Sequence, residues 1–129
     1  MNKLDKESIV GISALLVHAA KIDEIYSDHE KNLVKDFIKS YLKNDDVNEI
    51  LKKAEEIENN SNQLLNYTNI IKEKSLDIKR DIVEHLWKVI ISDNTVDQYE
   101  SNLMRRICGL IYFPDKECAE IKLKLINKK

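Results

Sequence analysis

Two short acidic segments carry side chains that could bind a metal ion. KIDEIYSDHE contains Asp23 and Glu30, and SDNTVDQYE contains Asp93, Asp97 and Glu100. Carboxylate oxygens are the ligands that Ca²⁺ and Mg²⁺ prefer, so these five acids are candidate metal ligands. The spacing excludes an EF-hand, because no glycine occupies the sixth loop position and no glutamate follows at the twelfth.

Helix capping is a competing explanation for four polar side chains in these segments. Ser27 precedes Glu30 by three residues, and Asp97 precedes Glu100 by the same interval. This is the spacing of a capping box, in which the first side chain accepts a backbone hydrogen bond and the glutamate reaches back to the cap amide. We therefore predict that both segments begin helices at these caps.

Capping does not explain Asp23 and Asp93. Both lie where the preceding helix is expected to end, and the helix dipole disfavours an anion there. Each calls for a local hydrogen bond or a cation. We predict that the main role of both turns is to cap helices and that ion binding is at most a secondary role. Any ion site would be exposed, weak and selective for Ca²⁺ or Mg²⁺ over Zn²⁺.

The elements around these acids are expected to be helices throughout. The chain has 129 residues with only two glycines and one proline, and its apolar residues recur at helical spacing. We predict one all-α domain over residues 1–129, a bundle of about seven helices with the fifth as its most buried element. ENNSNQ, residues 58–63, is the most loop-like stretch. The expected helices span roughly residues 6–22, 28–43, 47–57, 64–71, 75–90, 98–110 and 115–126.

An internal repeat links the two acidic segments. A shift of 70 residues places LLVHAAKIDEIYSDHEKNLVKDFI on HLWKVIISDNTVDQYESNLMRRIC, so that Asp23 meets Asp93 and Glu30 meets Glu100. Each copy predicts a helix, an acidic turn and a second helix. We expect the two similar hairpins to pack face to face.

Composition restricts the function classes. The net charge is −2 and the basic residues are dispersed, which argues against nucleic-acid binding. No apolar run is long enough to cross a bilayer, so we expect a cytoplasmic protein without membrane insertion. Cys108 and Cys118 are interpreted as small core residues in a reducing cytosol, with a disulfide as the alternative. Trp87 is expected to anchor the core, and AEEIE, residues 54–58, to form a solvated face.

The second acidic segment resembles the motif of the tellurite-resistance protein B (TerB-like) family. That motif is Asp-Gly-x-hydrophobic-x-x-x-Glu between two helices. Asp93, Val96 and Glu100 match it, and Asn94 stands at the glycine position. The resemblance runs from about residue 6 to residue 125.

The first acidic segment resembles the same motif. Asp23, Tyr26 and Glu30 match it, but Glu24 stands at the glycine position. A glutamate fits the left-handed backbone of such a turn poorly. The second turn is therefore expected to bind an ion better than the first.

The resemblance implies an all-α cytosolic domain, linked to stress responses such as tellurite resistance, whose acids take part in metal binding. We expect a non-enzymatic module that binds protein partners and, secondarily, a divalent cation; a homodimer is compatible with this. The alternative is a metal-dependent enzyme that uses the carboxylates of Asp23, Glu30, Asp93 and Glu100.

Overall fold

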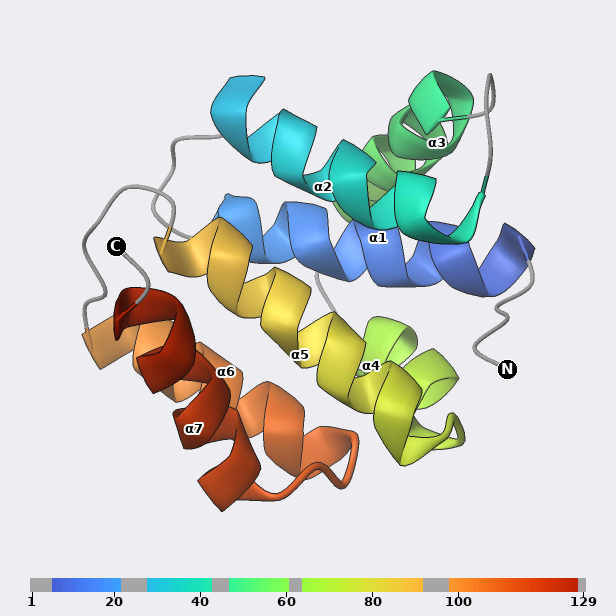
Figure 1. Ribbon diagram of the computed structural model, residues 1–129. Coiled ribbons are helices and arrows are strands. Elements are labelled where there is room, and N and C mark those ends of the chain that lie inside the picture. Colours follow the sequence, from blue (N-terminus) through green and yellow to red (C-terminus); the bar gives the residue numbers. More distant parts are fainter. Residues whose placement is uncertain (1–5, 22–27, 43–46, 61–63, 92–97, 128–129) are drawn as a thin grey trace.

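Seven helices make up the described part of the chain. A computed structural model describes residues 6–21, 28–42, 47–60, 64–91 and 98–127 (Figure 1). No strand occurs in these ranges, so the predicted all-α fold is confirmed. None of the helices described is long and apolar enough to cross a membrane. The helices are α1 Lys6–Ala20, α2 Asp28–Tyr41, α3 Val47–Asn60, α4 Leu64–Lys72, α5 Leu76–Ile91, α6 Gln98–Leu110 and α7 Asp115–Asn127.

Several helix starts agree with the predicted caps. α2 begins at Asp28 and α6 at Gln98, directly after Ser27 and Asp97. Ser27 and Asp97 themselves lie outside the described residues. At the start of α5, the Ser75 hydroxyl accepts a hydrogen bond from the Ile78 amide at 3.3 Å, which is an N-cap contact.

The first helix, rather than the fifth, is the most deeply buried element. Eleven of the fifteen residues of α1 are buried, and α1 packs against α2, α3, α4 and α5. α5 contacts α1, α2, α6 and α7, and part of its surface faces solvent. The prediction that α5 would be the most buried helix was wrong, because α1 packs more extensively against α3 and α4 than α5 packs against α6 and α7.

The internal repeat is visible in the helix boundaries. α1 and α2 correspond to α5 and α6 under the 70-residue shift, with ends that agree to within one residue. The hairpins do not pack simply face to face, since α5 lies against both α1 and α2 whereas α6 packs on α4, α5 and α7. In Figure 1 the C-terminal ends of α1 and α5 and the N-terminal ends of α2 and α6 lie at the same end of the bundle.

A close helix approach depends on Gly11. α1 packs against α4, and a methyl group added at Gly11 would lie 2.3 Å from Cδ1 of Ile70. Any side chain at position 11 would therefore force Ile70 to move. The absence of a side chain at Gly11 lets α4 lie close to the central helix.

Candidate functional site

The five predicted metal ligands are only partly described by the structure. Asp23, Asp93 and Asp97 lie outside the described residues, and Glu100 lies in the first turn of α6 with a side chain that is not described. Glu30 lies in the first turn of α2 and is 6% exposed. A buried carboxylate in a first turn suits a capping role, because the helix dipole and free amides favour an anion there.

Among the described residues, no group of three or more histidine, cysteine, aspartate or glutamate side chains could hold a metal ion. Of the five candidate ligands, Glu30 is the one whose side chain the structure describes. A hard cation at Glu30 would need further oxygen ligands, and the side chains of the other four candidate acids lie outside the part of the chain that the structure describes.

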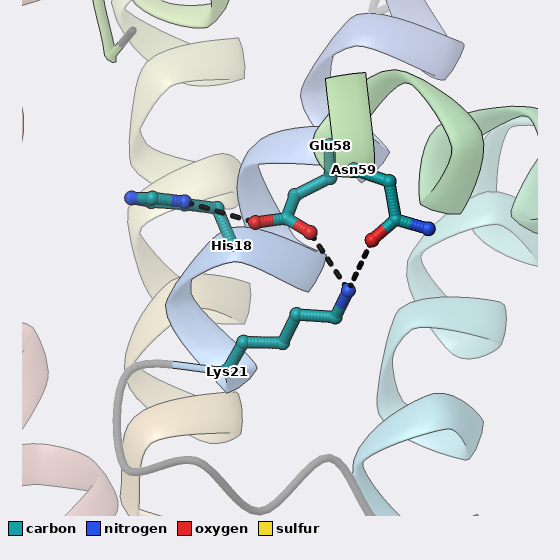
Figure 2. Close-up of polar contacts among 4 residues, drawn as sticks. All are labelled: His18, Lys21, Glu58 and Asn59. Atoms are coloured by element: carbon teal, nitrogen blue, oxygen red, sulfur yellow. Dashed lines mark hydrogen bonds and ion pairs between the residues drawn. The ribbon is translucent and has the colours of Figure 1, made fainter. Parts of the chain in front are cut away.

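A polar cluster that the sequence did not predict lies next to the first acidic segment. Figure 2 shows the carboxylate of Glu58, near the end of α3, reaching towards His18 and Lys21. Lys21 Nζ donates to Glu58 Oε1 at 2.8 Å and to Asn59 Oδ1 at 3.0 Å. Nδ1 of His18 lies 3.2 Å from Glu58 Oε2. The cluster ties the last turn of α3 to the end of α1, immediately before residues 22–27.

Glu58 corrects two sequence-based predictions. The sequence predicts that Glu58 lies on a solvated face and at the start of a loop. In the structure, Glu58 is helical and only 6% exposed. Glu58 is buried because it follows the buried Ala54 by one helical turn and so lies on the face of α3 that packs against α1. Its charge opposes the dipole at the end of α3, and Lys21 and His18 offset that charge.

A second polar cluster joins α2 to α5. The Tyr41 hydroxyl donates to Asp81 Oδ2 at 2.6 Å, and Nδ1 of His85 lies 2.8 Å from the Asp81 carbonyl oxygen. The His85 ring meets Phe37 edge-on at 5.1 Å. Burial, together with the hydrogen bond to Asp81, raises the pKa of Tyr41. His85 thus makes a local hydrogen bond, whereas His18 pairs with a residue 40 positions away.

An apolar groove opens where α1, α3 and α4 meet. It has a volume of about 490 Å³, and its wall is mainly carbon. Ile57 is 40% exposed at this groove, whereas Tyr67 is buried beneath it. The lining residues are Lys6, Glu7, Val10, Gly11, Lys53, Ile57, Tyr67 and Ile70. The sequence did not predict the groove, because its walls come from three helices brought together only in the folded chain.

Comparison with known proteins gives one match. A family model described as "Tellurite resistance protein TerB" matches residues 10–123, nearly the whole chain. No curated protein and no solved structure matches the sequence.

Proposed function

The chain belongs to the TerB family, and from this membership we propose that it is a non-enzymatic binding module that holds a partner protein in the groove between α1, α3 and α4. The observation that carries the proposal is the groove itself. In the groove, Ile57 is 40% exposed and adjoins a hollow lined mainly by carbon, and a contiguous apolar surface of this kind is typical of a protein interaction site.

The shape and rim of the groove favour one occupant, an amphipathic helix of a partner protein. Such a helix places apolar side chains at intervals of three and four residues, which suits a groove formed between helices. Lys6 and Lys53 lie at the rim against the single acid Glu7, so acidic residues beside the apolar face would be attracted. Lys53 pairs with Glu49 only at 3.8 Å, in a surface contact too weak to prevent this.

The polar clusters elsewhere support this choice of surface. The carboxylate of Glu58 is held by Lys21 and His18, and the carboxylate of Asp81 by Tyr41. A partner that bound either carboxylate would compete with these contacts. Binding in the groove leaves both clusters intact.

Two matched variants test the proposal. Ile57→Glu places a charge in the groove. Leu123→Glu is the control, because Leu123 is an exposed residue of the same size on α7, outside the groove. Each chain is used to capture its partner from the cells that naturally make the protein. We expect the wild-type chain and Leu123→Glu to capture the partner, and Ile57→Glu to fail. The purified partner should then bind the wild type at least about tenfold more tightly than Ile57→Glu, or roughly 1.4 kcal/mol.

Equal binding of the purified partner by both variants would overturn the groove proposal. A partner that proves to be a second copy of the chain would overturn the choice of an amphipathic helix from another protein. Sedimentation of the wild-type chain over a range of concentrations identifies that outcome.

The proposal includes a divalent cation as a secondary ligand of the acidic turns. It is supported by the two family-type motifs and by the position of the flanking helix ends at one end of the bundle (Figure 1). Glu30 and the acids Asp23, Asp93, Asp97 and Glu100 would supply oxygen ligands, and the ion would neutralise their charge.

Titration with Ca²⁺ and Mg²⁺, followed by amide chemical shifts, tests this cation site. We expect shifts centred on residues 93–100 that Asp93→Asn removes. An unchanged spectrum at millimolar concentrations of both ions would show that the turns have only a structural role. The alternative of a metal-dependent enzyme also requires this binding, and would additionally show turnover that Glu100→Gln abolishes.

A role in a stress response in the cytoplasm is part of the proposal. It is supported by the description of the matching family, which concerns tellurite resistance. Deleting the gene and complementing it with wild type or Ile57→Glu would test whether the groove matters under tellurite stress. Equal growth of both complemented strains would contradict it.

A further inference from the structure

A second hollow opens where α5, α6 and α7 meet. It has a volume of about 520 Å³, which is within the range of pockets that hold small molecules in other proteins. Its inner wall is formed by three buried side chains, Trp87 of α5, Met104 of α6 and Cys118 of α7, which is a free thiol. The hollow therefore offers an apolar surface against which the body of a small organic ligand could lie.

The hollow lies where α7 covers the second hairpin of the repeat. α3 packs against α1 and α2, and α7 packs in the corresponding way against α5 and α6, but the packing of α3 is the more extensive. On the side of α7, the small side chains of Cys118 and Ala119 line the hollow. The space beside Trp87 is therefore left unfilled by the chain itself.

The charged side chains of the hollow are mostly cationic. Arg105 of α6 and Lys116 and Lys122 of α7 line it, against the single carboxylate of Asp115. Within the described ranges, none of these three cations forms an ion pair with an acid. Glu117, the next acid along α7, is paired with an arginine of α5 instead. The hollow thus carries an excess of positive charge, which favours an anionic ligand.

The ammonium group of Lys122 is held beside the inner wall. Its Nζ lies 5.3 Å from the centre of the Trp87 ring, a position that the electrons of the indole stabilise. The indole is fixed in turn, because its Nε1 donates to the Cys118 carbonyl oxygen at 3.1 Å. A lysine ammonium has three N–H donors, and no described residue supplies Lys122 with a hydrogen-bond acceptor. An anion in the hollow would supply one.

We propose that this hollow is a binding site for a small organic anion, a molecule with a carboxylate or phosphate group on a compact apolar body. Arg105, Lys116 and Lys122 bind the anionic group, and the forked guanidinium of Arg105 suits carboxylate and phosphate alike. The apolar body lies against Trp87 and Met104. The site is separate from the groove between α1, α3 and α4, and it does not depend on a partner protein in that groove.

Titration of the purified full chain with three single-ring probes tests the site. Benzoate and phenyl phosphate carry the two anionic groups, and benzyl alcohol is their neutral counterpart. Trp87 is the only tryptophan of the chain, so an anion that draws the Lys122 ammonium away from the indole changes the fluorescence. We expect saturable binding of one or both anions at millimolar concentrations, and the tighter one identifies the preferred group. Benzyl alcohol should bind at least about tenfold more weakly, because it cannot form charge-assisted hydrogen bonds.

Amide chemical shifts of the wild-type chain locate the bound probe. We expect the tighter anion to shift signals centred on residues 87, 104 and 118–122. Failure of both anions to bind, equal binding of benzyl alcohol, or shifts centred on the groove between α1, α3 and α4 would each overturn the proposal. This measurement needs no variant, so it decides the matter even where a substitution disturbs folding.

Paired substitutions separate the site from the general charge of the surface. Arg105→Gln and Lys122→Gln should each weaken binding of the anion several-fold, because each removes a charged donor. Arg106→Gln on α6 and Lys124→Gln on α7 are the matched controls, since both residues are exposed and lie outside the hollow. We expect the controls to bind as the wild type does. Equal losses within either pair would overturn the site.

Discussion

Glu58 supplies the carboxylate of the polar cluster at the ends of α1 and α3, and its side chain is only 8% exposed. Its own helix end disfavours its charge, so the ion pair with Lys21 and the contact with His18 decide whether it is tolerated. The capping spacing of Ser27 and Glu30 could be predicted from neighbours in the sequence. The pairing of Glu58 could not, because its partners lie 37 and 40 residues away and meet it only in the folded chain.

Neutralising Glu58 should cost stability. In Glu58→Gln the Lys21 ammonium loses its anionic partner near the protein interior, and we expect unfolding in urea to require about 2 kcal/mol less free energy. Glu56→Gln, at an exposed residue of the same helix, is the matched control and should change the free energy by less than about 0.5 kcal/mol. Equal midpoints for the two variants would contradict a structural role for the cluster.

Tyr41 should make stability depend on alkaline pH. Its pKa is raised above the usual value of about 10, so the folded state holds the phenol proton more tightly than the unfolded state. This contribution is complete below about pH 10 and is lost as pH rises through the folded value. Tyr41→Phe should be about 1 kcal/mol less stable at pH 8, because the bond to Asp81 is lost, and the difference should narrow above pH 10.

Urea unfolding at pH 8 and at higher pH measures that difference for Tyr41→Phe. Tyr112→Phe, at a phenol that is 69% exposed, is the control and should stay within about 0.5 kcal/mol of the wild type at pH 8. A difference for Tyr41→Phe that widens with pH would contradict the assigned direction of the pKa shift.

At the scale of elements, the end of α6 shows what the sequence could and could not predict. Proline cannot continue a helix, and α7 begins directly after Pro114, at Asp115. The way α6 ends was not predictable, because a tyrosine occupies the left-handed position that glycine usually takes. Tyr112 has φ of 60°, the Phe113 amide donates to the Cys108 carbonyl at 2.8 Å, and the Tyr112 amide donates to Gly109 at 3.4 Å. This is a Schellman motif.

The left-handed backbone at Tyr112 predicts different stabilities for two small substitutions. Tyr112→Gly relieves the left-handed conformation, and Tyr112→Ala keeps it. Both lose the contacts of the ring with the ammonium groups of Lys72 and Lys79, at 5.5 and 6.0 Å. We expect the glycine variant to be about 1 kcal/mol more stable than the alanine variant in thermal or urea unfolding. Equal stability would show that the backbone at Tyr112 is unstrained.

At the scale of the whole molecule, the repeat was readable from sequence but its packing was not. The 70-residue repeat predicts the positions of four helices, α1, α2, α5 and α6, because apolar and acidic residues recur together in its two copies. The inserted helices α3 and α4 cover α1, extend the helical part beyond residue 57 and create the groove. Gly11 permits that arrangement by its lack of a side chain, a feature whose meaning depends on Ile70, 59 positions away.

The central claim is that the groove between α1, α3 and α4 holds a partner helix. A photo-crosslinking amino acid placed at Ile57, and separately at Leu123, tests it most directly in cells that make the native partner. We expect one protein to crosslink at position 57 through an amphipathic helical segment, and not to crosslink at position 123. Crosslinks to the same protein from both positions, or from position 123 alone, would contradict the account.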